Sequence, residues 1–311
     1  MTSKNHDRPA IVIAGPTAGG KTALALALAH ALPGGGECIN ADSMQVYRGM
    51  NIGTAKPTVA EREGIPHHLM DIVDPSEPYS LERWLAAAEH TVHDVRARGG
   101  WPIVVGGTSL YLQTFYYGML EGPGRNPDLR RELDALDEQQ LRTRLEVEDP
   151  EAAERLHPND RRRTIRALEV AATGTPLSAL QGQWSGPHRT DALLIGLDWP
   201  VEDINRRINA RVRDMAANGL LDEVRTLAPT LGQQAREALG YKQLLPVVNE
   251  ETTLTDALEQ VKIRTRRFAK QQRTWLRRFQ QIKPALWLKK VEKQTQGAAT
   301  AAVAWMLEQV G

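Results

Sequence analysis

Short apolar runs alternate with helical patterns in the first third of the chain. Residues 10–15 (AIVIAG) have the length and composition of a buried strand, and the Ala- and Leu-rich segment from Lys21 favours a helix. The glycines at 33–36 would end this helix, and residues 37–43 form the next strand pattern. Residues 101–115 repeat the order of strand, glycine turn and helix. This alternation predicts an α/β fold in which helices cover both faces of a parallel sheet.

Charged helical segments replace this alternation in the middle of the chain, and none of them has the pattern of a central strand. Residues 191–200 (DALLIGLDWP) return to a strand pattern, and a helix pair and a long helix at about 254–281 follow. We therefore predict a core domain formed by residues 1–120 and 192–311, interrupted by a helical insertion domain at 121–191.

The composition is that of an ordinary soluble globular protein. The chain has 311 residues, of which 41% are hydrophobic and 25% are charged. Its first residues lack the features of a secretory signal, and no run approaches the roughly 18 apolar residues of a membrane span. We therefore expect a cytoplasmic protein that does not enter a membrane. Cys38, the only cysteine, is expected to be a buried strand residue rather than a nucleophile.

A candidate phosphate-binding loop joins the first predicted strand to the first predicted helix. Its spacing is G-x-x-x-x-G-K-T, formed by Gly15, Pro16, Thr17, Ala18, Gly19, Gly20, Lys21 and Thr22. In such a loop the glycines let backbone N–H groups point at phosphate oxygens, the lysine adds a positive charge, and the threonine hydroxyl binds Mg²⁺. The motif predicts a bound diphosphate or triphosphate, but it does not specify the reaction.

The carboxylate best placed near these phosphates is Asp42, at the end of the second predicted strand. An ATPase or GTPase would need a further apolar strand ending in Asp, whereas the strand at 101–105 ends in glycines. This difference leaves small-molecule kinases and enzymes that release diphosphate. Asp42 could take a proton from an attacking nucleophile, or it could cap the turn that follows it; the pattern alone favours neither role.

Two arginine-rich segments indicate an anionic partner. Arg161, Arg162 and Arg163 lie in the first turn of a helix expected to begin at Asp160, where the helix dipole disfavours cations. A glutamate from elsewhere in the chain or an RNA phosphate backbone could compensate them.

The second segment is Val261–Phe279, which contains no acidic residue. Helical spacing predicts an apolar stripe of Val261, Phe268, Trp275 and Phe279, opposite a basic stripe of Lys262, Arg266, Lys270, Arg273 and Arg277. The basic stripe fits a nucleic-acid backbone better than a membrane surface, because the apolar stripe is narrow and is needed for packing. The formal net charge of +1 is then the sum of a basic groove and acidic surfaces elsewhere.

These motifs together resemble the bacterial tRNA dimethylallyltransferases, also called tRNA isopentenyltransferases or IPP transferases. The resemblance covers nearly the whole chain. It includes, in the family's order and spacing, GPTAGGKT, DSMQVYRGMNIGTAKPT, PHHLMDI, VGGTSLYL, HPNDRRRTIRALEV, ALGYKQ and RTRRFAKQQRTWLRR. It implies a P-loop NTPase-like parallel sheet flanked by helices, with a helical insertion domain that contacts tRNA.

The resemblance also implies a reaction and its residues. The phosphate loop would hold dimethylallyl diphosphate with Mg²⁺, and N6 of the adenosine at position 37 of tRNA would attack the allylic carbon and release diphosphate. Asp42 would take the N6 proton, and Thr108 would lie beside the reacting centre. The expected contacts with the anticodon stem-loop are Ser43, Met44, Gln45, Arg130, Arg162, Arg163, Arg166, Gly240, Tyr241, Lys270, Arg273 and Arg277. A monomer is expected.

Three other functions are compatible with parts of the sequence. A P-loop kinase of a small metabolite or nucleotide would use the same loop to transfer a phosphoryl group. An adenylate isopentenyltransferase acting on free AMP would have little use for the basic helix. An RNA-binding adaptor would keep the loop without its activity.

Overall fold

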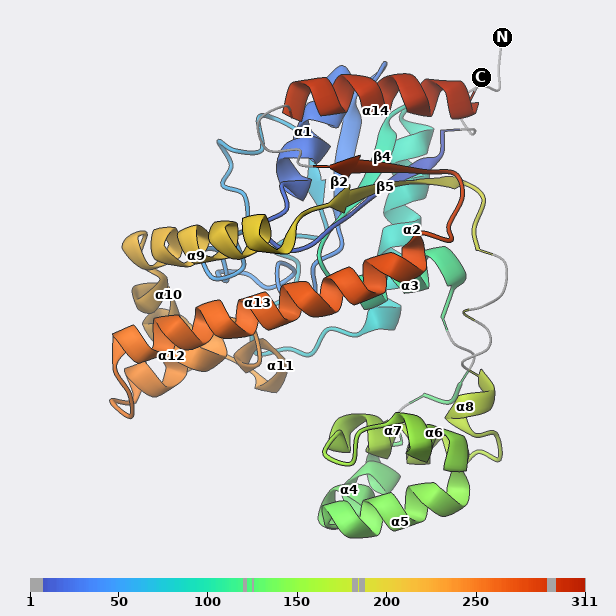
Figure 1. Cartoon of the computed structure of the whole chain (residues 1–311), viewed down its shortest axis with the longest axis vertical. Helices are drawn as coiled ribbons and strands as arrows, with labels where there is room; N and C mark the ends of the chain where they lie inside the picture. Colours follow the sequence, from blue (N-terminus) through green and yellow to red (C-terminus); the bar gives the residue numbers. More distant parts are fainter. Residues whose placement is uncertain are drawn as a thin grey trace. The chain divides into compact units, whose positions relative to one another are not determined.

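The computed structural model describes residues 8–119, 122–124, 126–180, 184, 188–289 and 295–310 (Figure 1). The chain forms two compact units. The first combines Met1–Phe115 with Arg189–Gly311, and the second is Tyr116–His188. The boundaries expected from the sequence, at 120/121 and 191/192, lie a few residues from these.

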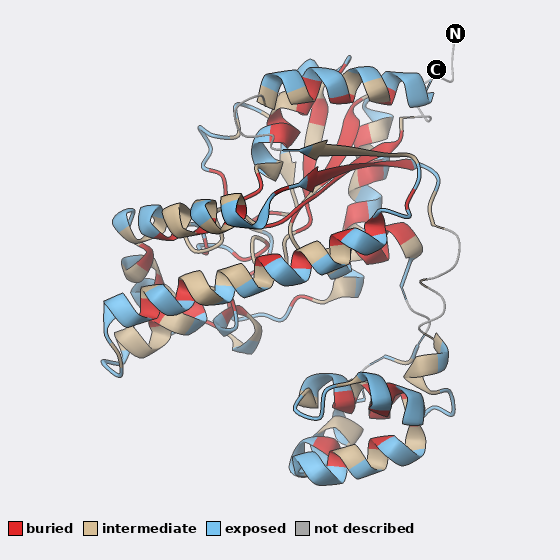
Figure 2. Ribbon diagram, viewed as in Figure 1, coloured by how far each residue is buried: buried red, intermediate tan, exposed pale blue. Residues whose placement is uncertain are grey.

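The first unit contains a six-stranded sheet with the order β3-β2-β4-β1-β5-β6. Its strands are β1 (Ala10–Ala14), β2 (Gly36–Asn40), β3 (His67–His68), β4 (Trp101–Val105), β5 (Ala192–Asp198) and β6 (Ala285–Lys289). All neighbouring strands are parallel, as predicted. The central strand β1 is fully buried (Figure 2). Because β1 and β2 are parallel strands of one sheet, their carboxyl ends lie at the same edge. The residues that follow them, the phosphate loop and Asp42, therefore begin at this edge.

The helices of the first unit are α1 (Lys21–Ala31), α2 (Leu81–Ala97), α3 (Ser109–Tyr117), α9 (Val201–Ala217), α10 (Leu220–Leu227), α11 (Gln233–Arg236), α12 (Tyr241–Val248), α13 (Leu254–Phe279) and α14 (Thr295–Val310). Helices α1 and α14 pack together, and their buried leucine, alanine and methionine side chains form one core with β1 and β5. Helix α2 packs against β2 and β4. Helix α13 packs against both α9 and α12.

The buried face of α13 differs from the predicted apolar stripe. Its buried residues are Ala257, Val261, Ala269, Gln272, Leu276 and Phe279. Phe268 and Trp275 are only partly buried. The buried face is turned toward Ala269 and Leu276 because two neighbouring helices cover it, and hydrophobic spacing alone does not report on where those neighbours lie.

The second unit consists of helices over the residues described. They are α4 (Pro127–Ala135), α5 (Glu138–Glu148), α6 (Pro150–Arg155), α7 (Arg161–Ala171) and α8 (Leu177–Leu180). Leucines from α4, α5 and α7 form a separate core. The predicted helix start is confirmed, because the Asp160 side chain accepts a hydrogen bond from the Arg163 N–H at 3.2 Å and caps α7.

Cys38 is fully buried in β2, and this burial raises the pKa of its thiol to about 12. The thiol is therefore not a nucleophile, in agreement with the sequence. Among the described helices, none combines the length and apolar character needed to cross a membrane.

Candidate functional site

The phosphate loop runs from β1 into α1 and is held from outside by two side chains. Ala18 and Gly20 have positive φ angles of 60° and 85°, which give the loop its tight turns. The indole Nε1 of Trp199 donates to the Gly19 carbonyl at 3.0 Å. The guanidinium of Arg207 donates to the Ala18 carbonyl and stacks on the Trp199 ring. Because these two carbonyls are bound on the outside, the conformation of the loop is fixed by groups beyond the loop itself.

Lys21, the first residue of α1, folds back over the loop. Its Nζ donates to the carbonyls of Gly15 at 3.1 Å and Pro16 at 2.9 Å. Burial, and then the nearby charge of Arg211, lower the pKa of Lys21 to about 8, while the charge of Asp42 opposes this shift. A cation with a lowered pKa beside a second cation marks a site that favours an anion.

Arg211 on α9 is a site residue that the sequence analysis missed. An open pocket of about 270 Å³ lies beside the loop, lined by Ala18, Arg207, Ala210, Arg211 and Asp214. Among the described residues, no hydrogen bond or ion pair to the Arg211 guanidinium is found, and burial lowers its pKa. Arg207 and Arg211 stand four residues apart, so the helix presents both on one face. This spacing of two arginines, on the helix that follows the predicted strand at 191–200, was the available signal.

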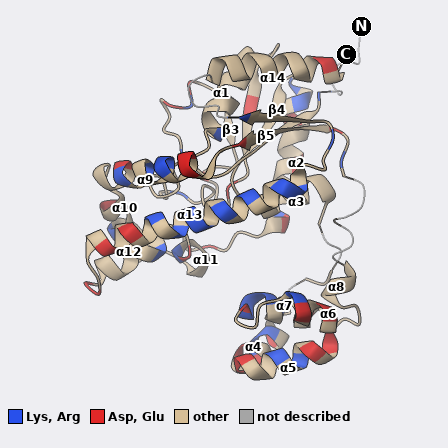
Figure 3. Cartoon of the chain, in the orientation of Figure 1, with Lys and Arg blue, Asp and Glu red and all other residues tan. Residues whose placement is uncertain are grey.

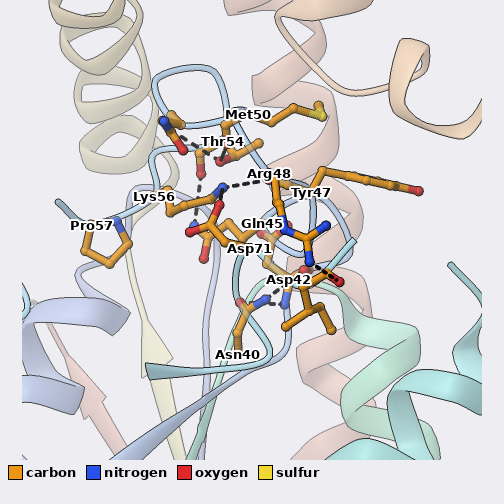
Figure 4. Close-up of polar contacts among 12 residues, drawn as sticks. Asn40, Asp42, Gln45, Tyr47, Arg48, Met50, Thr54, Lys56, Pro57 and Asp71 are labelled. Atoms are coloured by element: carbon orange, nitrogen blue, oxygen red, sulfur yellow. Dashed lines mark hydrogen bonds and ion pairs between the residues drawn. The ribbon is translucent and has the colours of Figure 1, made fainter. Parts of the chain in front are cut away.

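The carboxylate of Asp42 caps the turn after β2 with one oxygen and leaves its other oxygen without a hydrogen bond among the described residues. Its Oδ1 accepts a hydrogen bond from the Met44 N–H at 2.9 Å, which caps the turn after β2. The Asn40 side chain fixes the same turn, since it accepts from the Asp42 N–H at 3.1 Å and donates to the Asp42 carbonyl at 3.0 Å (Figure 4). No hydrogen bond to Oδ2 is found within the described part of the chain. One oxygen is therefore structural and the other is available for chemistry.

The glycine pair after β4 brings the phosphate loop and Asp42 together. A Cβ on Gly106 would lie 2.1 Å from the Ala41 carbonyl carbon, so only glycine permits this approach of two backbones. A Cβ on Gly107 would lie 3.6 Å from Asp42 Oδ2 and 3.9 Å from Lys21 Nζ. The carboxylate and the ammonium group thus face the same small space over Gly107.

Thr108 follows the glycine pair and is bound to the segment after β2. Its N–H donates to the Ala41 carbonyl at 3.1 Å. Its hydroxyl accepts from the Ser43 N–H at 2.9 Å and donates to the Ser43 hydroxyl at 3.2 Å. The structure therefore brings together Asp42, Ser43 and Thr108, which the sequence had placed in one site.

Gln45 belongs to a loop that is held by its own polar contacts (Figure 4). The Gln45 side chain donates to the Thr54 carbonyl at 3.0 Å. The ammonium group of Lys56 is buried, donates to the Tyr47 carbonyl at 2.7 Å and forms an ion pair with Asp71. Contacts between its own residues therefore hold the loop after β2 in place beside Asp42.

Glu223 on α10 is a second residue that the sequence analysis missed. Its carboxylate accepts hydrogen bonds from three successive backbone N–H groups, those of Asn51, Ile52 and Gly53, at 2.8 to 3.0 Å. It also accepts a hydrogen bond from the Tyr241 hydroxyl. A carboxylate with four donors fixes the far end of the loop that carries Gln45.

Gly240 and Tyr241 lie at the start of α12 and are both buried. Gly240 has a φ angle of 92°. A Cβ on Gly53 would lie 2.4 Å from a ring carbon of Tyr241, so the tyrosine ring packs directly against this glycine. The RNA contact expected at this pair is not available to the Tyr241 side chain, because the ring is enclosed and its hydroxyl is bound to Glu223.

Figure 3 shows that Lys and Arg are frequent along α13. The five residues of the predicted basic stripe divide into paired and unpaired ones. Lys262 forms an ion pair with Glu259, and Arg266 donates to the Asn209 side chain at 2.8 Å. The remaining three are Lys270, Arg273 and Arg277, for which the described residues provide no ion pair. Lys270 and Arg277 are exposed. These three form the free part of the predicted basic stripe.

The arginines of the second unit are divided in the same way. Buried Glu169 forms an ion pair with Arg130 at 2.9 Å and lies 3.7 Å from Arg166. Arg162 and Arg163 are exposed on the first turn of α7, and Arg163 lies 3.4 Å from Asp160. Glu169 thus compensates Arg130 and Arg166 but not the predicted cluster of Arg161, Arg162 and Arg163, in which Arg161 donates to the Asp134 carbonyl at 2.7 Å. Arg162 and Arg163 carry the exposed charge of that cluster.

His67 and His68 form the short edge strand β3. His68 contacts Glu37 at 2.6 Å, whereas His67 contacts the Ile65 carbonyl at 2.9 Å. The two side chains therefore have different partners. Over the residues that the structure describes, no group of three histidine, cysteine or acidic side chains could hold one.

Comparison with known proteins places the chain among enzymes of one family. A family model described as IPP transferase matches residues 45–279. The tRNA dimethylallyltransferase of Anaeromyxobacter dehalogenans is 47% identical over 275 residues, which cover 86% of this chain and 91% of that protein.

Two solved structures are also similar along most of the chain. The tRNA delta(2)-isopentenylpyrophosphate transferase of Staphylococcus epidermidis has a TM-score of 0.70 at 36% identity, covering 96% of this chain and 98% of that one. A eukaryotic dimethylallyltransferase acting on tRNA has a TM-score of 0.81 at 32% identity, covering 97% of this chain and 79% of that one. The chain therefore belongs to the IPP transferase family, together with proteins named tRNA dimethylallyltransferases.

Proposed function

We propose that the protein transfers the dimethylallyl group of dimethylallyl diphosphate to N6 of the adenosine at position 37 of tRNA, releasing diphosphate. Membership of the IPP transferase family supports this transferase reaction rather than phosphoryl transfer by a kinase. The observation that carries the proposal is the meeting of Lys21 Nζ and Asp42 Oδ2 over Gly107. A cation that holds a diphosphate and a carboxylate that takes a proton are both within reach of one small space.

The phosphate loop and its cations would bind and stabilise the leaving group. The backbone of Gly15–Thr22 and the ammonium group of Lys21 would hold the diphosphate, and Arg211 would add a second positive charge from α9. As the allylic C–O bond breaks, its electron pair passes to the diphosphate oxygen. Fixed positive groups at that oxygen stabilise the charge that develops there.

Asp42 would accept the proton that N6 loses as the new C–N bond forms. Its Oδ1 is bound to the Met44 N–H, so the carboxylate is oriented while Oδ2 faces the reacting space. Thr108 lies beside it and is oriented by Ser43. This arrangement supports Asp42 as the proposed base and Thr108 as its neighbour.

Mg²⁺ is proposed as the cofactor, bound together with the diphosphate. The Thr22 side chain lies exposed in the first turn of α1, where its hydroxyl is a hard oxygen ligand of the kind that Mg²⁺ prefers. Because Mg²⁺ commonly takes few protein ligands and completes its shell with phosphate oxygens and water, this donor set fits it. When bound, the ion would neutralise charge on the departing diphosphate.

The tRNA would meet the protein along exposed or unpaired cations. In the first unit these are Lys270, Arg273 and Arg277 on α13, and in the second they are Arg162 and Arg163. Arg130 and Arg166 would support that second surface from their places beside Glu169. Ser43, Met44 and Gln45 stand next to Asp42 and would line the adenosine site, with the base drawn out of its stack.

Gly240 and Tyr241 are both buried, so we do not expect their side chains to touch RNA. They would instead support the loop after β2, because Tyr241 packs against Gly53 and binds Glu223.

An adenylate isopentenyltransferase acting on free AMP would leave the unpaired cations of α13 without a partner. The relatives are named for action on tRNA. A cytoplasmic location and a monomeric state remain part of the proposal, as properties that suit a tRNA substrate.

Mass analysis of nucleosides tests the proposal directly. Purified protein is incubated with Mg²⁺, dimethylallyl diphosphate and an anticodon stem-loop RNA, and we expect adenosine that carries one added five-carbon unit. Asp42→Asn retains an oxygen that can accept the Met44 N–H but loses the proton acceptor, so the single-turnover rate should fall by about 10²–10⁴-fold. Phosphorylated product formed from ATP and a small acceptor, with no prenylated nucleoside, would instead support a kinase.

A further inference from the structure

A glutamine in the C-terminal half of the basic helix α13 binds both the phosphate loop and the glycine turn after β4. Gln272 has only 2% of its surface exposed, although the residues on either side of it, Gln271 and Arg273, are exposed or partly exposed. A buried side-chain amide is costly unless its donor and acceptor are both bonded. In Gln272 both ends are bonded, and both partners are backbone groups of the functional site.

The acceptor end of Gln272 binds the phosphate loop. Its Oε1 accepts a hydrogen bond from the Thr17 N–H at 2.7 Å. Thr17 stands between Pro16, whose carbonyl is bound by Lys21, and Ala18, whose carbonyl is bound by Arg207. This hydrogen bond therefore fixes the remaining part of the loop's first turn from the side of α13.

The donor end of Gln272 binds the glycine turn after β4. Its Nε2 donates to the Gly107 carbonyl at 2.7 Å. A Cβ on Gly107 would lie 2.9 Å from this nitrogen and 3.6 Å from Asp42 Oδ2. A shift of the Gln272 amide would therefore move the phosphate loop and the turn before Thr108 together.

The same helix carries the unpaired cations Lys270, Arg273 and Arg277. A helix is stiff along its axis, and Lys270 and Arg273 lie within one turn of Gln272. A polyanion that displaces or rotates α13 would therefore also move the Gln272 side chain. We propose that Gln272 is a positioning residue that couples the docking of RNA on α13 to the geometry of the phosphate loop and of the Asp42–Thr108 turn. This inference rests on the proposed function, since it takes an RNA as the ligand of α13.

The coupling is measured as a ratio of two affinities. Inorganic diphosphate with Mg²⁺ serves as the probe of the loop, and its dissociation constant is measured by calorimetry with and without a saturating anticodon stem-loop RNA. In the wild type we expect the RNA to tighten diphosphate binding by about five- to tenfold, with the same factor for the effect of diphosphate on RNA. A variant that merely loosens the fold weakens both affinities and leaves their ratio unchanged.

Gln272→Met keeps the length of the side chain and removes both hydrogen bonds, and we expect it to reduce the ratio to about one. Gln271→Met is the matched control, because residue 271 is the exposed neighbour on the same helix, and it should keep the wild-type ratio. In steady state, Gln272→Met should lower kcat more than it raises KM for RNA, because the unpaired cations Lys270, Arg273 and Arg277 are unchanged.

Thermal unfolding of each variant shows whether it is folded. If Gln272→Met does not fold, Gln272→Glu tests the same idea, because it keeps the acceptor for Thr17 and loses the donor to Gly107. An unchanged ratio in a folded Gln272 variant, or a wild-type ratio of one, would overturn the coupling. Prenylation of RNA by the wild type in either case would show that the proposed function still holds.

Discussion

The two oxygens of Asp42 show why a residue's role could not be settled from its position in the sequence. An aspartate before a turn commonly caps that turn, and an aspartate at the carboxyl end of a strand commonly contacts a ligand. Here Oδ1 caps the turn through the Met44 N–H, and Oδ2 faces Gly107. The cap orients the carboxylate so that Oδ2 faces this space, and the two interpretations are therefore compatible with one arrangement.

Lys21 gives a prediction about pH. Its pKa of about 8 is set by burial and by Arg211, and only the protonated amine attracts a diphosphate. Affinity for dimethylallyl diphosphate should therefore be fully present below pH 8 and should fall by up to about tenfold per pH unit above it. The measurement is KM for dimethylallyl diphosphate from about pH 7 to about pH 9.5. Lys21→Arg is the control, because its guanidinium stays charged over this range. The KM of this variant need not equal that of the wild type, but it should not change with pH.

At the scale of elements, hydrophobic patterning predicted the strands with strong apolar runs and the helix starts with a capping residue. The strands at 10–14, 101–105 and 192–198 and the cap at Asp160 are confirmed. The edge strands β3 and β6 were not predicted, because β3 has two residues and β6 is only partly buried. Short or half-buried strands are defined by the neighbour they pair with, and that neighbour is distant in sequence.

The candidate site was predictable to the same degree. The phosphate loop and Asp42 are suggested by local sequence patterns and Thr108 by the family resemblance, so all three could be proposed as site residues from the sequence. Gln272 and Glu223 were missed because the backbone groups that they bind, such as those of Gly107 and Gly53, are 165 or more residues away. A buried glutamine on a helix or a glutamate on an amphipathic helix is ordinary in sequence, and only the fold shows which backbone groups it binds.

Glu223 gives a prediction for the loop after β2. Glu223→Gln replaces an acceptor of four hydrogen bonds by a group with only one accepting oxygen, so we expect a loss of about 1–2 kcal/mol in the free energy of unfolding. Amide exchange at 51–53 should become faster, and kcat should fall because the loop also holds Gln45. Hydrogen exchange read by mass spectrometry, denaturant unfolding and steady-state kinetics measure these effects.

The neighbouring acid on α10 provides the control for this experiment. Asp222 is exposed and pairs with Arg225 on the surface, so Asp222→Asn should change stability by less than about 0.5 kcal/mol. Equal exchange rates at 51–53 in Glu223→Gln and the wild type would mean that the loop is held by its internal contacts, such as Lys56 with Asp71, and not by α10.

At the scale of the whole molecule, net charge is a poor guide to the partner. The formal charge of +1 hides a helix segment without acids, because ion pairs and acidic residues elsewhere cancel it. Each unit has its own core, and each carries exposed arginines that lack a strong partner within the described residues. In each unit these charges suit a polyanionic ligand.

The dependence of RNA binding on salt tests the contribution of α13 to that surface. Replacing Lys270, Arg273 and Arg277 by Gln removes three cations without a protein partner in the described structure, and each phosphate contact that is lost releases about one counterion fewer. The slope of log K against log salt for an anticodon stem-loop should therefore become less steep by about two to three, measured by fluorescence anisotropy. Arg225→Gln, which removes an exposed cation paired with Asp222, should leave the slope nearly unchanged. If both variants reduced the slope equally, the attraction would come from the total charge of the protein and not from a defined docking surface on α13.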